Sequence, residues 1–80
     1  MFIPVVDMKR TGQNITALRM QRGLSVRRLQ SLLGFTTPQA IYKWQRGETL
    51  PSIDNLVALA RILSVPMDSI VAAECRTEQR

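Results

Sequence analysis

The sequence predicts an all-α fold, a bundle of five short helices preceded by a short extended N-terminal arm. Glycines at positions 12, 23, 34 and 47 divide the chain into short segments, and glycine is a common residue at the end of a helix. Between these glycines, apolar residues recur three or four positions apart, which is the spacing of one helix face. Eighty residues are enough for one small domain with a narrow margin of stability.

The arm is expected to span residues 1–10. Its apolar part, FIPVV at residues 2–6, favours a β conformation, but Pro4 restricts such a segment to the edge of a sheet. The arm is therefore expected to be an edge strand or an extended segment. It lies on its own domain or pairs with a second copy of the chain, and the sequence leaves both open.

The first two helices are expected at residues 11–22 and 26–33. Thr11 and Ser25 are suitable N-terminal caps, and each helix is followed by a glycine. Ile15 and Leu18 share one face of the first helix. The apolar side of the second consists of Val26, Leu29, Leu32 and Leu33.

The third helix is expected in the segment TTPQAIYKWQRG, residues 36–47. Thr37 is its predicted N-cap, and Pro38 falls in the first turn, where its missing N–H costs nothing. Ile41 and Trp44 are three positions apart and are expected to face the core. Because only a few residues separate the second and third helices, the two are expected to form a helix-turn-helix.

The fourth helix is expected at residues 53–63 and is capped by Ser52. Its apolar stripe is expected to consist of Leu56, Leu59, Ala60 and Leu63, with Ile53 extending it by one turn. A short fifth helix is expected within VPMDSIVAA, residues 65–73, with Met67, Ile70 and Val71 facing inward. The polar tail, residues 74–80, is expected to fray. The predicted domain thus spans residues 11–73.

Composition argues against several classes of function. The chain has one cysteine, Cys75, and no histidine, so an internal disulfide, a zinc site and a histidine-based catalytic triad are not expected. No carboxylate pair or activated nucleophile stands out, and we expect neither an enzyme nor a bound cofactor. No apolar run approaches the length of a membrane span, and the N-terminus lacks the order of a signal peptide. A cytoplasmic protein, associated with the nucleoid when bound to DNA, is therefore expected.

The distribution of charge points to a polyanionic partner. From residue 9 to residue 46 the chain has eight basic residues and no acidic one. From residue 47 to residue 80 it has three basic and five acidic residues, a net charge of −2. A nucleic acid explains this asymmetry directly, although a solvated surface with unevenly placed charges is the alternative.

In a helix-turn-helix the second helix enters the major groove of DNA and its first residues contact base edges. Gln39 can bond adenine in bidentate fashion, and Lys43, one turn later, can reach guanine or a phosphate. The N-terminus of the preceding helix offers free amides and positive charge to a phosphate. The predicted DNA-binding residues are Ser25, Arg27, Arg28, Thr37, Pro38, Gln39, Tyr42, Lys43 and Arg46.

The segment from GLSVRRLQ to VPMDSI, with the helix before it, resembles the XRE family, the Cro/lambda-repressor-type helix-turn-helix proteins. The matching features, spread over about residues 13–71, are Arg19, Leu24-Ser25, Leu33-Gly34, Trp44 to Gly47 and Pro51-Ser52. The resemblance implies a five-helix lambda-repressor-like bundle, sequence-specific binding of double-stranded DNA and a two-fold dimer on a palindrome. The sequence departs from the usual pattern of that family at three positions: Val26 stands where the family usually has glutamine, Gln30 where it has a small alanine, and Gln45 where it has glutamate. Because Gln45 is neutral, it cannot form the usual ion pair with Arg19, and an ion pair between Arg19 and Glu48 is expected instead.

Two functions fit these observations. The first is a DNA-binding transcriptional regulator, a repressor acting as a homodimer on a palindromic operator. The second is a protein-interaction module, such as an antitoxin or an adaptor, that holds another protein with the FIPVV arm and the MDSIV segment. A steep dependence of DNA affinity on salt, together with sequence preference, would separate the first from the second.

Overall fold

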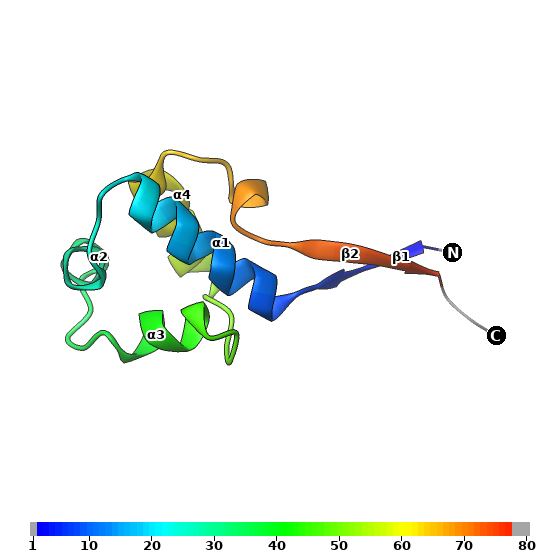
Figure 1. Ribbon diagram of the computed structural model, residues 1–80, viewed down its shortest axis with the longest axis horizontal. Coiled ribbons are helices and arrows are strands. Elements are labelled where there is room, and N and C mark those ends of the chain that lie inside the picture. Colours follow the sequence, from blue (N-terminus) through cyan, green and yellow to red (C-terminus); the bar gives the residue numbers. More distant parts are fainter. Residues whose placement is uncertain (1, 78–80) are drawn as a thin grey trace.

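The computed structural model of the chain describes residues 2–77; Met1 of the expected arm and residues 78–80 of the expected tail lie outside them. Four α-helices form a bundle, and a two-stranded sheet extends from one end of it (Figure 1). The described part is elongated, with extents of 47 × 22 × 20 Å. In chain order the elements are β1 (Phe2–Val6), α1 (Met8–Gln21), α2 (Val26–Leu33), α3 (Gln39–Gln45), α4 (Ile53–Leu63), a 3₁₀ turn η1 (Met67–Ser69) and β2 (Ala73–Thr77).

The prediction of a fifth α-helix is wrong. Where a fifth helix was expected, the chain makes only the three-residue turn η1 and then becomes extended. The reason is a partner distant in sequence: β2 pairs antiparallel with β1, from Phe2↔Thr77 to Val6↔Ala73. Residues 74–77, expected to fray, are therefore part of a strand. The sequence allowed the arm to lie on its own domain or to pair with a second copy; in the structure it pairs with β2 of the same chain.

Helix α1 begins three residues earlier than expected. Its N-cap is Asp7, whose carboxylate accepts a hydrogen bond from the Arg10 amide at 2.9 Å. Thr11, the predicted cap, is buried inside the helix, and its hydroxyl accepts a bond from the Ala72 amide at 2.9 Å. The Ala72 carbonyl in turn accepts from the Asp7 amide at 2.8 Å. These bonds fix the point at which the sheet joins the bundle.

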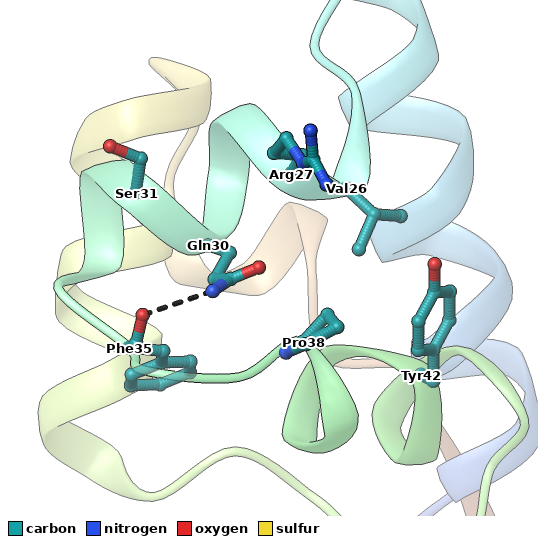
Figure 2. Close-up of a pocket in the computed structure, with 7 residues that line it drawn as sticks. All are labelled: Val26, Arg27, Gln30, Ser31, Phe35, Pro38 and Tyr42. Carbon is teal, nitrogen blue, oxygen red and sulfur yellow. Dashed lines mark hydrogen bonds between the residues drawn. The ribbon is translucent and has the colours of Figure 1, made fainter.

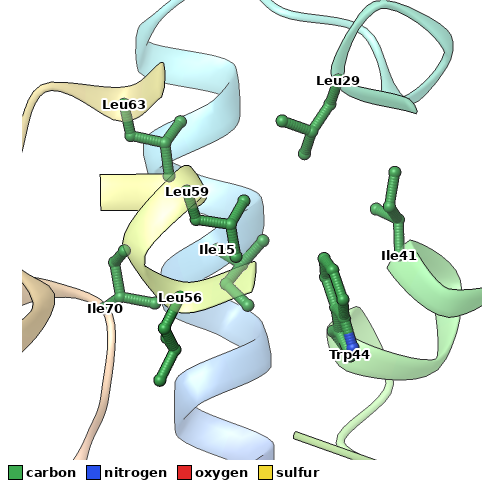
Figure 3. Packing of buried hydrophobic residues seen from close by; sticks show 8 residues of the cluster. All are labelled: Ile15, Leu29, Ile41, Trp44, Leu56, Leu59, Leu63 and Ile70. Atoms are coloured by element: carbon green, nitrogen blue, oxygen red, sulfur yellow. The ribbon is translucent and has the colours of Figure 1, made fainter. Parts of the chain in front are cut away.

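The hydrophobic core lies between the four helices and η1 (Figure 3). Most of the residues predicted to face inward are buried: Ile15, Leu29, Ile41, Trp44, Leu56, Leu59, Leu63 and Ile70. Three predicted core residues are instead exposed, Leu32 at 45%, Ile53 at 72% and Met67 at 43%. All three lie in the first or last turns of short elements, where helical spacing alone does not guarantee a neighbouring element to pack against.

Helices α1 and α3 touch through backbone at Gly12. A Cβ atom at this position would overlap the Trp44 carbonyl oxygen and lie 2.9 Å from that of Gln45. Gly12 is not at a helix end, as its spacing suggested, but inside α1, where glycine is normally unfavourable. The close approach is the reason for it: α3 lies directly on the surface of α1.

We expect Gly12→Ala to destabilise the protein by about 3 kcal/mol, because the added methyl group forces α1 and α3 apart. The midpoint of urea unfolding measures this. Gln13→Ala, at the neighbouring exposed position of the same helix, is the matched control and should change stability by less than about 0.5 kcal/mol. Equal midpoints for the two variants would contradict the close packing described above.

Candidate nucleic-acid interface

The two helices of the predicted helix-turn-helix are α2 and α3, joined by residues 34–38. The Ser25 hydroxyl caps α2 by accepting from the Arg28 amide at 3.0 Å, as the sequence predicts. Gly34 ends the helix in the left-handed conformation, with φ 74°. The conformation favours glycine, because a side chain there would clash with its own backbone.

Two contacts hold the turn between these helices. The Gln30 side-chain amide of α2 donates to the Phe35 carbonyl oxygen at 3.2 Å. The Phe35 ring then packs edge-on against Trp44 of α3, with ring centroids 5.8 Å apart. One residue of the turn is thus bound to both helices, and this fixes the angle between them.

Helix α3 begins one residue later than predicted. The amide of Tyr42 donates to the carbonyl of Pro38 at 3.1 Å, so Pro38, and not Thr37, is the N-cap. No side chain caps this end of the helix. Thr37 is exposed in the turn.

Arg19 of α1 anchors both helices from behind. Its Nε donates to Oε1 of Gln45 in α3 at 3.1 Å, and its Nη1 donates to the carbonyl of Leu24, just before α2, at 2.7 Å. The predicted ion pair between Arg19 and Glu48 is therefore wrong. Gln45 supplies a neutral acceptor at the position where the family usually has glutamate, and Glu48 pairs elsewhere.

The inward and outward faces of α3 are cleanly divided. Ile41 and Trp44 are buried, as expected. Of the nine predicted DNA-binding residues, all but half-buried Pro38 are exposed: Ser25, Arg27, Arg28, Thr37, Gln39, Tyr42, Lys43 and Arg46. All nine lie on α2, on α3 or at their ends. Four of them are basic, so this surface is positive.

A hollow of about 510 Å³ separates the first turns of α2 from α3 (Figure 2). Arg27 and Val26 border it on the α2 side, and Tyr42 and Pro38 border it on the α3 side. Gln30, Ser31 and Phe35 close it toward the turn. Sequence reasoning missed Gln30 as a residue that shapes this surface. The signal was present, since glutamine stands where the family has a small residue, and a longer side chain there must find a partner.

Arg46 and Glu48 form an ion pair beyond the end of α3. Their hydrogen bond lowers the pKa of Glu48 and raises the pKa of Arg46. Both groups are solvent-exposed, so solvent screens the pair. The pair persists at neutral pH and is lost as the pH falls through the lowered pKa of Glu48. At neutral pH, therefore, Glu48 partly neutralises one of the four basic residues of this surface.

Within residues 2–77, no group of three or more His, Cys, Asp or Glu residues could hold a metal ion. None of the helices in the same range is long and apolar enough to cross a membrane.

The sequence matches the family model described as helix-turn-helix over residues 15–70, more than half of the chain. The chain belongs to the helix-turn-helix family. This confirms the resemblance to the XRE type. No curated protein sequence matches the chain.

Several solved structures are similar to this helix-turn-helix protein. One is the restriction-modification controller protein C.AhdI from Aeromonas hydrophila, with 28% sequence identity and a TM-score of 0.72; the alignment covers 80% of this chain and 96% of that one. The DNA-binding domain of BldD has 22% identity and a TM-score of 0.70, with coverage of 82% and 94%. Apo-HppE has 22% identity and a TM-score of 0.73, but the alignment, over 85% of this chain, covers only 37% of HppE. At such identities the last two show the fold alone.

Proposed function

We propose that this helix-turn-helix protein is a sequence-specific regulator of transcription that represses by binding a palindromic operator as a homodimer. The observation that supports it best is the division of α3. Its apolar residues are buried against the bundle, which leaves Gln39, Tyr42 and Lys43 exposed on the other side. The C.AhdI controller and the DNA-binding domain of BldD share this fold.

In this proposal α3 enters the major groove and reads base edges. Gln39 is the first residue of the helix and is exposed, so its amide can donate to N7 or accept from N6 of adenine. Lys43 follows one turn later on the same side and reaches guanine or a phosphate. Tyr42, 42% exposed at the edge of the hollow, can donate its hydroxyl to a phosphate.

The remaining residues position the protein on the DNA backbone. Arg27 and Arg28, together with those amides of the first turn of α2 that Ser25 does not cap, suit a phosphate on one side of the hollow. Arg46 suits a phosphate at the far end of α3. Three uncharged residues are also proposed to contact the DNA backbone: Ser25, Thr37 and Pro38.

A dimer is proposed because one domain of this size makes only a modest interface with DNA. Two copies related by a two-fold axis contact two half-sites of a palindrome. Both contribute phosphate contacts, so that affinity and specificity increase together.

One observation favours the alternative, a protein-interaction module such as an antitoxin or an adaptor. An apolar hollow of about 300 Å³ is bordered by residues of β1, α4 and the segments before α4 and after η1, among them Val6, Leu50, Pro51, Ile53 and Val71. Exposed apolar surface of this kind is often a binding site for another protein.

Selection from a random pool of double-stranded DNA, followed by titration of the selected site at several salt concentrations, tests the proposed function. We expect a palindromic consensus. We also expect the logarithm of the binding constant to fall linearly with the logarithm of salt concentration, with a slope of about −0.9 per phosphate contacted. A pool that yields no consensus, with weak binding that salt hardly changes, would rule out the regulator and favour the interaction module.

Replacing Gln39 by alanine should weaken binding to the selected site by about 1–3 kcal/mol and leave binding to random DNA nearly unchanged. The reason is that a base-edge contact contributes only on the correct sequence. Gln13→Ala, an exposed glutamine of α1, serves as the control. An equal loss on both DNAs would remove Gln39 from the base-reading residues.

Replacing Glu48 by glutamine should strengthen binding to all DNA sequences and steepen the salt dependence by about one phosphate contact, because it releases Arg46 from its ion pair. Asp54→Asn, at an exposed position in the first turn of α4, removes the same charge without touching Arg46. If the two variants change affinity and salt slope equally, only net charge matters, and Arg46 does not contact a phosphate.

A further inference from the structure

The hollow between α2 and α3 has an apolar side. Val26, the first residue of α2, borders it together with Pro38 and Tyr42, and Figure 2 shows the Val26 side chain pointing from α2 toward these two. We refer to the three residues as the apolar strip. Val26 and Pro38 are half-buried, and Tyr42 is 42% exposed. All three thus keep apolar atoms in contact with water, and a ligand that covers these atoms is bound more tightly.

The other side of the hollow is polar and positive. Arg27 borders it beside Val26, and Gln30 follows on the same helix. Gln30 is held in place, because its side-chain amide donates to the Phe35 carbonyl oxygen at 3.2 Å. In the described part of the chain, none of the residues that border the hollow is acidic. These surroundings fit a ligand that carries an apolar group close to a negative charge.

DNA offers this combination in its major groove. The C5-methyl group of thymine projects into the groove, and the phosphates of the same strand lie at the edge of the groove. The adenine–thymine pair is distinguished there by this methyl group as well as by its hydrogen-bonding groups. An apolar strip beside an arginine can therefore hold the methyl group while the arginine binds a phosphate.

We propose that the apolar strip holds the C5-methyl group of one thymine in each half-site, and that Val26 determines the preference for thymine at that position. The inference rests on the proposed function and extends it. In a helix-turn-helix the first helix crosses the DNA backbone and the second reads the bases. Here α2, through Val26, takes part in reading the sequence.

The neighbours of the strip indicate where this thymine lies. Gln39, the proposed adenine-reading residue, directly follows Pro38 in the chain. Arg27, proposed to contact a phosphate, directly follows Val26. The strip therefore lies between a base contact and a backbone contact. We expect the thymine next to the base pair that Gln39 reads.

The identity of residue 26 supports an apolar ligand. Valine stands here where the family usually has glutamine. A glutamine side chain has donors and an acceptor for a phosphate or a base edge, whereas a valine side chain has neither. Val26 can therefore contribute to binding only by covering an apolar group, and of the groups that the bases present in the major groove, the thymine methyl is the apolar one.

Replacing thymine by uracil in the selected DNA site tests the inference with the full chain. Uracil lacks the C5-methyl group and keeps the hydrogen-bonding groups of thymine. Each thymine of one half-site is replaced in turn, and affinity is measured by fluorescence anisotropy. At the position next to the base pair read by Gln39, uracil should weaken binding about fourfold, the effect of leaving one methyl group uncovered. A selected site without thymine at this position would overturn the proposal.

Val26→Ala shows whether the effect depends on the apolar strip. This variant should bind the thymine and uracil sites about equally, because alanine is too short to cover the methyl group. The control is Leu32→Ala, which shortens an apolar residue of α2 that is 45% exposed and does not border the hollow; it should keep the fourfold ratio. Both DNAs are compared on the same protein, so a small loss of stability cancels. A ratio that Val26→Ala leaves unchanged at every thymine would overturn the proposal.

Cytosine and 5-methylcytosine, each paired with guanine at the same position, provide an independent measurement. They differ from each other by the same methyl group but present other hydrogen-bonding groups than thymine does. We expect 5-methylcytosine to bind about fourfold more tightly than cytosine, and Val26→Ala to abolish the difference. Equal affinities for the unchanged protein would contradict a contact with the methyl group.

A phosphate in the hollow is the competing occupant, and it would leave all of these ratios at about one. The outcome for the proposed function is distinct. A palindromic consensus whose thymine–uracil ratios do not depend on Val26 would contradict only the methyl contact. A pool without a consensus would contradict the proposed function and, with it, the methyl contact.

Discussion

The arrangement of the molecule depends on the direct contact between α1 and α3 at Gly12. With no side chain at this position, the backbone of α3 at Trp44 and Gln45 rests against α1. The contact buries Ile41 and Trp44 and thereby determines which side of α3 faces solvent. A seven-residue helix has too little length to hold its orientation alone, so its outward face is set by what the inward face touches. Gly12 lies against the buried side of α3, and the contact it permits therefore determines which residues of α3 are exposed at the candidate interface.

Polar contacts then make α2, the turn and α3 a single unit. Arg19 bonds to Gln45 and to the Leu24 carbonyl, and Gln30 bonds to the Phe35 carbonyl. Two of these contacts use glutamine where the family usually has another residue. Gln30 and Gln45 are both half-buried, and the side chain of each has a hydrogen-bond partner. The partner of Gln30 is the Phe35 carbonyl, and that of Gln45 is the Arg19 guanidinium, so both glutamines are compatible with the fold. A half-buried amide without a partner would instead destabilise the protein.

The molecule has two ends that differ in chemistry. One end presents basic and polar side chains on α2 and α3 around an open hollow. The other is a narrow ribbon in which β1 and β2 pair antiparallel. The bonds of Thr11 and Asp7 with Ala72 hold the ribbon against the start of α1.

The sequence by itself determined the four α-helices, most of the core and the family. Helical spacing, Ser25 and Ser52 as caps, and Gly34 and Gly47 as stops are local signals, and the structure agrees with them. The sequence also predicted which side of α3 is buried and which side is exposed. The tertiary structure alone decided the rest. Strand β2 exists because its partner is β1, whose paired residues lie 67 to 75 positions earlier in the sequence, and no local pattern contains that information. Thr11 became a buried acceptor for Ala72, Gly12 a helix contact, and Arg19 a partner of Gln45, because each role depends on a group distant in sequence.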